Sequence, residues 1–117
     1  MLDVLKITIA EQEKTLRPSI KALRNIEDSL GISIGELGQD MASGKLSTSL
    51  IVETLYFGLE AGGNKVSRVD IEKELEDRGL DCFNEAILGF FLVGTIGEAR
   101  ATVVLDQLKL QEKTDSE

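Results

Sequence analysis

The amino-acid sequence predicts a mainly α-helical fold, in which a short N-terminal β-hairpin precedes a compact array of about five helices. Between residues 17 and 81, short amphipathic segments begin at capping residues and mostly end at glycine, which is typical of successive helices. One proline and 4% aromatic residues favour helices over a sandwich of short strands. With 42% hydrophobic residues, the 117-residue chain can bury one core, so we expect a single domain. The glycines that close four successive segments are Gly31, Gly44, Gly62 and Gly79.

The hairpin is predicted from a period-two pattern in residues 5–10. Leu5, Ile7 and Ile9 face one way, whereas Lys6 and Thr8 face the other. We expect a reverse turn at residues 11–13 and a returning strand at residues 14–17. Because a two-stranded hairpin is marginally stable alone, it should lean on the helices.

The first helix is expected to begin at Pro18, where the missing N–H is harmless, and to end at Gly31. Its apolar stripe consists of Ile20, Leu23, Ile26 and Leu30.

The second helix begins with a capping box formed by Ser33 and Glu36, and ends near Gly44. Its short apolar side consists of Ile34, Leu37 and Met41. Gly35 and Gly38 weaken this helix by roughly 1 kcal/mol each relative to alanine. We expect these two glycines to admit a closely packed neighbouring backbone.

Serine caps also predict the third and fourth helices. Ser47 precedes a helix that runs to about Ala61, and Ser67 precedes one that ends at Gly79. The residues expected to be buried are Leu50, Ile51, Leu55 and Leu59 in the third helix, and Ile71 and Leu75 in the fourth.

The fifth segment opens at Leu80 and Asp81 and contains the most apolar stretch of the chain, so it should be the central helix. Gly94 and Gly97 predict a kink or break. Residues 98–117 then form an amphipathic extension, with a frayed polar tail at residues 111–117. The extension has apolar residues at helical spacing, but its β-branched residues 102–104 leave a strand as the alternative. We therefore divide the chain into a helical domain, residues 1–97, whose hairpin is residues 1–17, and an extension, residues 98–117.

Charge and composition argue against several classes of partner. The formal net charge is -8, and residues 1–30 are neutral overall, so the acidity lies later in the chain and disfavours nucleic-acid binding. Arg17, Lys21 and Arg24 share a helical face, which we interpret as solvated. No secretory signal is visible, and the longest apolar run, residues 87–93, is far too short to cross a bilayer.

The residues that usually carry reactive chemistry are scarce. The chain has no histidine and no metal-ligand spacing, and no glycine-rich phosphate loop follows a strand. Cys82 is the single cysteine; we interpret it as a small buried residue, although a position near a helix start can lower a thiol pKa. The carboxylate pairs Glu72/Glu76 and Glu74/Asp77 are interpreted as a solvated helix face. We therefore expect no enzymatic activity, no metal and no cofactor.

Binding surfaces remain as the candidate function. The helices have difficulty burying all of Tyr56, Phe57, Phe90 and Phe91, so some are expected to line a groove for a partner helix. Ordinary core packing is the alternative. Val104 and Leu108 of the extension are further candidates for partner contact.

The order of segments between residues 15 and 97 resembles the tail assembly chaperones of long-tailed phages, in the branch of the gene transfer agents, whose members are sometimes labelled tail tube proteins. The resemblance rests on residues 16–19 (LRPS), 22–27 (ALRNIE), 34–37 (IGEL), 41–44 (MASG), 55–59 (LYFGL) and 69–80. These are capping and hydrophobic patterns rather than catalytic signatures.

The resemblance implies a non-enzymatic assembly factor in the cytoplasm of a bacterial host, absent from the mature particle. Its implied partners are the tape measure protein, which it would coat, and the tail tube subunit; self-association would multiply the contacts. Two alternatives stay open. One is a structural tail component, such as a tube or connector subunit, although such subunits usually rest on a large β-sandwich. The other is a small regulatory protein-binding module.

Overall fold

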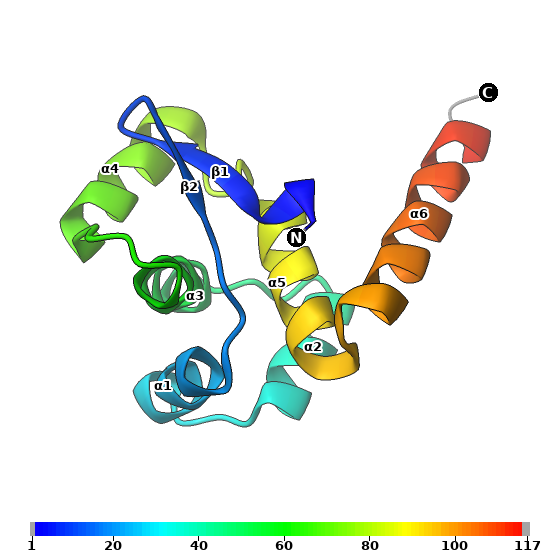
Figure 1. Cartoon of the computed structure of the whole chain (residues 1–117), viewed down its shortest axis with the longest axis horizontal. Helices are drawn as coiled ribbons and strands as arrows, with labels where there is room; N and C mark the ends of the chain where they lie inside the picture. Colours follow the sequence, from blue (N-terminus) through cyan, green and yellow to red (C-terminus); the bar gives the residue numbers. More distant parts are fainter. Residues whose placement is uncertain (1, 116–117) are drawn as a thin grey trace.

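Within residues 2–115, an antiparallel hairpin is followed by six α-helices, which confirms the predicted mainly helical class (Figure 1). The computed structural model describes the backbone of residues 2–115 and the side chains of residues 2–41 and 43–110. The elements are η1 (Asp3–Leu5), β1 (Lys6–Ile9), β2 (Gln12–Thr15), α1 (Ile20–Leu30), α2 (Ile34–Ala42), α3 (Thr48–Ala61), α4 (Arg68–Arg78), α5 (Asn84–Ile96) and α6 (Glu98–Asp115).

The hairpin turns earlier than predicted. Strand β1 pairs with β2 so that Ile9 lies opposite Gln12, which leaves Ala10 and Glu11 as a two-residue turn. Both turn residues have positive φ, 52° and 65°, as a tight hairpin turn requires. The turn therefore lies at residues 10–11, and the expected turn at residues 11–13 is wrong. The sequence did not indicate the turn because neither residue is the glycine or asparagine that usually marks one.

The hairpin leans on the helices, as expected. Leu5, Ile7 and Ile9 are all buried. At its tip, the N–H of Ala10 donates to a Glu74 carboxylate oxygen of α4 at 2.7 Å. Arg78, one turn further along α4, donates to the carbonyl oxygen of Thr8 at 2.9 Å. Glu74 thus fixes the tip of the hairpin to α4 and is not simply part of a solvated acidic face.

Serine caps begin the first four helices. The hydroxyl oxygens of Ser19, Ser33, Ser47 and Ser67 each accept a hydrogen bond from the backbone N–H three residues later. The cap at Ser19 corrects the prediction that α1 begins at Pro18, which instead precedes the cap.

The predicted apolar stripe of α1 is also shifted. Ala22 and Ile26 are buried, whereas Ile20 is 70% exposed, since it lies roughly 200° around the helix from Ala22.

Helices α3 and α5 contribute more buried hydrophobic residues than any other described element. The predicted buried residues of α3 and α4 are all buried. Helix α5 contacts η1, α2, α3 and α6, as expected of a central element (Figure 1). It begins at Asn84, after a turn that contains Leu80 and Asp81, and its cap residue Phe83 makes no side-chain capping bond.

Gly58 of α3 and Gly62, which directly follows the helix, allow the chain after β2 to cross α3 closely. The N–H of Arg17 donates to the carbonyl oxygen of Gly58 at 3.0 Å. A Cβ on Gly58 would lie 2.9 Å from side-chain carbons of both Leu16 and Phe90. At the helix end, a Cβ on Gly62 would collide with the carbonyl oxygen of Thr15. These glycines, rather than those of α2, make the close backbone contact.

The expected role of Gly35 and Gly38 in α2 is wrong. A Cβ on Gly35 would meet only the Ser33 hydroxyl at 3.8 Å, and one on Gly38 would meet nothing within 4 Å among the described atoms. We therefore predict that Gly38→Ala stabilises the protein by about 0.5–1 kcal/mol, because alanine removes the entropic cost of glycine in a helix. Urea unfolding measures this change; a loss of stability would contradict the open environment of this site.

The extension is helical rather than a strand. Gly97, with φ 85°, ends α5, while the helix continues unbroken through Gly94. Helix α6 follows immediately and leads away from the body of the molecule, with its main contact to α5 (Figure 1). Its buried hydrophobic residues among the described side chains are Ala101 and Leu105. Its backbone is helical to Asp115; of the polar tail expected at residues 111–117, the side chains and the backbone of residues 116–117 lie outside the described residues.

Candidate partner-binding surfaces

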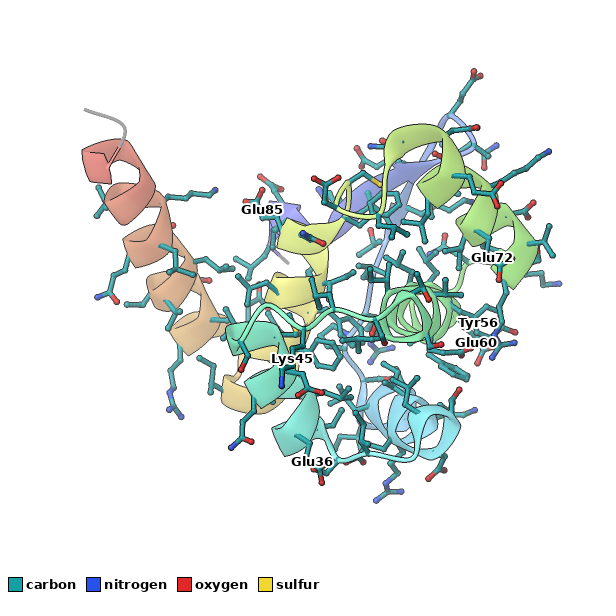
Figure 2. All side chains as sticks on the ribbon, turned by 180° about the vertical axis from the view of Figure 1, so that it is seen from behind. Glu36, Lys45, Tyr56, Glu60, Glu72 and Glu85 are labelled. Atoms are coloured by element: carbon teal, nitrogen blue, oxygen red, sulfur yellow. The ribbon has the colours of Figure 1, made fainter. Side chains whose placement is uncertain are left out.

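Tyr56 and Phe57 lie half-buried on α3, with their rings edge to face and their centroids 5.1 Å apart. The guanidinium of Arg68, the first residue of α4, stacks over the Tyr56 ring at 4.0 Å from its centroid. Phe57 is turned toward α1, where it lines a recess of about 310 Å³ together with Arg17 and Lys21. In Figure 2, which shows α3 nearly end-on, Tyr56 and Glu60 lie to the right of this helix and Glu72 of α4 lies above them.

Arg68 also joins α4 to α3 by a bidentate ion pair. Its Nε and Nη2 atoms each donate to one carboxylate oxygen of Glu53 at 2.9 Å. This hydrogen bond to Glu53 raises the pKa of Arg68 above its ordinary value. Sequence reasoning missed this pair because Glu53 and Arg68 are far apart in the chain.

A double-mutant cycle measures how much the pair contributes. Glu53→Gln and Arg68→Met should show a coupling free energy of about 1 kcal/mol, at the upper end for a surface pair because the geometry is bidentate. The coupling should decrease when NaCl is raised to about 1 M, since salt screens exposed charges. Urea unfolding of the four proteins gives the coupling, and additive effects of the two substitutions would contradict the contact.

Phe90 and Phe91 lie in the core. Phe90 is 0% exposed and Phe91 is 4% exposed, and their rings meet edge to face with centroids 5.4 Å apart. Both rings are therefore inaccessible in this conformation, as in the alternative of ordinary core packing. Contact with a partner would require α5 to move.

Helix α6 presents apolar side chains that the body does not cover. Val104 is half-buried, and Leu108 is 39% exposed. Val103 and Leu110 are more exposed still, at 57% and 64%. Sequence reasoning missed the latter two because they lie beside the predicted stripe.

A groove between α3 and α4, the α3–α4 groove, has a volume of about 530 Å³. Val52 and Leu75 line its floor, and Leu80, which is 51% exposed, lies at one end. Glu72 and Glu76 lie along the α4 edge, and the Glu53–Arg68 pair also contributes to the lining. Among the described side chains, neither Glu72 nor Glu76 pairs with a lysine or arginine.

The sequence also offered a cysteine and a basic helix face as candidates for chemistry or binding. Cys82 is half-buried, and burial raises the pKa of its thiol, so the lowering considered at a helix start is wrong. Arg17, Lys21 and Arg24 are all exposed, as a solvated face requires. Over the side chains that the structure describes, no group of three or more histidine, cysteine or acidic residues is placed to hold a metal ion. No helix in the described part of the chain has the length and apolar character needed to span a bilayer.

Comparison with known proteins adds one finding. Residues 4–87 match the family model described as "Phage tail tube protein, GTA-gp10", from η1 into the first turn of α5. The matched region includes the hairpin, the α3–α4 groove, Tyr56 and Phe57, but not α6, Phe90 or Phe91. No curated protein and no solved structure matches the chain.

Proposed function

Because the chain belongs to the phage tail assembly chaperone family, in the branch of the gene transfer agents, we propose that it is a non-enzymatic assembly factor that binds the tape measure protein. The observation that carries this proposal is the family match over residues 4–87. The chaperone acts in the cytoplasm of the bacterial host, assists assembly of the tail tube around the tape measure protein, and is absent from the finished particle.

The proposal follows from the physical problem that a tape measure protein poses. A very long helical chain with much apolar surface aggregates unless something covers it. A small protein with net charge -8 keeps such a complex in solution once its apolar surfaces are engaged. The exposed apolar side chains of α6, together with Tyr56, Phe57 and the α3–α4 groove, offer several modest contacts rather than one large interface.

Modest contacts also suit release. The tube subunit must displace the chaperone as the tube grows, and many weak contacts are broken one at a time more readily than a single tight interface. Self-association of the chaperone on its client would increase the number of contacts without increasing the strength of any one. Val104 and Leu108 are proposed as partner-contacting residues, and Phe90 and Phe91 remain candidates only for a client-induced rearrangement.

A second candidate is a structural tail component, which the family description "Phage tail tube protein" favours directly. Against this candidate, the β-structure of residues 2–115 is one two-stranded hairpin, whereas tube subunits are expected to rest on a large β-sandwich. The two candidates differ in whether the protein persists in purified particles.

Co-expression with the tape measure protein encoded in the same gene cluster tests the first candidate. We expect the tape measure protein to become soluble and to copurify with this chain, and to stay insoluble when expressed alone. The Phe90→Ser variant, whose core should not form, is the control. It shows whether the tape measure protein becomes soluble only beside a folded chaperone. A tape measure protein that stays insoluble and unbound beside the folded chain would contradict the proposal.

A further inference from the structure

We infer that the α3–α4 groove accepts an amphipathic helix that carries lysine or arginine along one edge of its apolar stripe. This inference rests on the proposed function, since the helix would be a segment of the tape measure client. It assigns to the client segment a charge pattern and an orientation of its edges in the groove, and neither follows from family membership.

The floor of the groove fits an apolar stripe. Val52 of α3 and Leu75 of α4 line it from opposite sides, and each is at most 9% exposed. Leu80 extends the apolar surface beyond the end of α4 and is 51% exposed. A docked helix would place an apolar side chain over Leu80. Leu80 supplies most of the exposed apolar surface that binding would bury in the groove.

The two edges of the groove differ in charge. Glu72 and Glu76 are four residues apart on α4, so both carboxylates lie on the same helix edge. The opposite edge carries the hydroxyl side chains of Thr48 and Ser49, which are uncharged. Arg68 neutralises Glu53 through its bidentate pair, so the net negative potential of the groove comes from the α4 edge.

This asymmetry selects the occupant. A helix in the groove places its lysine or arginine edge against Glu72 and Glu76, and its neutral polar edge against Thr48 and Ser49. A second copy of this chain fits poorly because it also carries a net charge of -8. Its α6, which exposes Val103, Leu108 and Leu110, has the basic residues Arg100 and Lys109 balanced by Glu98 and Asp106 over residues 98–110. A basic amphipathic client helix is therefore the occupant we propose.

The test uses two designed helical peptides of about 18 residues with the same leucine stripe, one flanked on one edge by lysine and the other by glutamate. Fluorescence anisotropy measures their binding to the full chain. We expect the lysine peptide to bind on the order of tenfold more tightly at low salt, and the difference to shrink in about 1 M NaCl.

Matched variants locate the site. Glu76→Lys should weaken binding of the lysine peptide on the order of tenfold, whereas Asp77→Lys, the same charge change at the adjacent exposed position outside the groove, should change it less than about twofold. Leu80→Ser should weaken binding, while Val69→Ser, at a more exposed apolar position of α4 outside the lining, should not. Circular dichroism confirms that these surface variants remain folded.

The outcomes separate this inference from the proposed function. Equal effects of Glu76→Lys and Asp77→Lys, or equal binding of the two peptides, would overturn the groove inference even if the tape measure protein copurifies. Concentration-dependent self-association that Glu76→Lys abolishes would overturn it in favour of a second copy as the occupant. If the lysine peptide binds in the groove but the tape measure protein does not bind the chain, the proposed client is wrong and the groove specificity stands on the peptide alone.

Discussion

Phe90→Ser is expected to destabilise the protein by about 3–5 kcal/mol, which is enough to unfold most of a marginally stable domain. The Phe90 ring is fully buried. It packs against Gly58 of α3 and against the ring of Phe91, its neighbour on α5. Serine leaves a cavity there and buries a hydroxyl group in apolar surroundings. Far-UV circular dichroism and urea unfolding measure the loss.

Tyr56→Ser is the matched control because Tyr56 is an aromatic residue of the same predicted set but is only half-buried. It should cost about 1–2 kcal/mol, chiefly through the lost contact with Arg68. A Phe90→Ser protein as stable as the Tyr56→Ser protein would show that α5 does not hold the core together.

Gly62→Ala is expected to cost about 3 kcal/mol, although φ and ψ of Gly62, -80° and 3°, suit any residue. The cost is steric, since the added Cβ collides with the carbonyl oxygen of Thr15. That oxygen cannot retreat freely because the side-chain amide of Asn64 donates to it at 3.2 Å. The N–H of Gly62 also donates to the Gly58 carbonyl oxygen at 3.1 Å, which fixes the helix end. Thermal and urea unfolding measure the change.

Gly63→Ala separates this collision from backbone strain. Gly63 has φ 85° and nothing within 4 Å of an added Cβ among the described atoms, so alanine there should cost only about 1 kcal/mol for the left-handed conformation. If Gly62→Ala were no more damaging than Gly63→Ala, the chain after β2 would not cross α3 as closely as described.

The helices could be predicted from the sequence because their boundaries depend on local chemistry. A serine hydroxyl that caps a helix needs only the N–H three residues later, so Ser33, Ser47 and Ser67 were recognisable without any knowledge of the fold. Stop signals were equally local at Gly31 and Gly79. The apolar stripes of α3 and α4 followed from helical spacing, and their predicted residues are all buried.

The features that were missed or misplaced depend on contacts between distant residues. The open surroundings of Gly38 and the crowded ones of Gly62 are indistinguishable in sequence, because the difference is the position of Thr15. Ile20 was expected inside, but α3 packs on the face of α1 that carries Ala22 and Ile26. The hairpin turn lacked a sequence signal because two ordinary residues, Ala10 and Glu11, adopt positive φ.

The candidate surfaces were only partly predictable for the same reason. Aromatic residues were counted as too many to bury, but the structure buries Phe90 and Phe91 and leaves Tyr56 and Phe57 at the edge of the core. Glu72 and Glu76 were visible as a pair with i, i+4 spacing. Their place beside the apolar floor of Val52 and Leu75 required the packing of α4 on α3.

Quantitative mass spectrometry of purified particles and of assembling cells tests the central claim most directly, because an assembly factor leaves and a structural subunit stays. We predict that this chain is abundant beside the tape measure protein during assembly and is depleted from finished particles relative to the tail tube subunit. An amount in finished particles comparable to that of the tube subunit would contradict the assignment as an assembly chaperone and would make the chain a structural component of the tail.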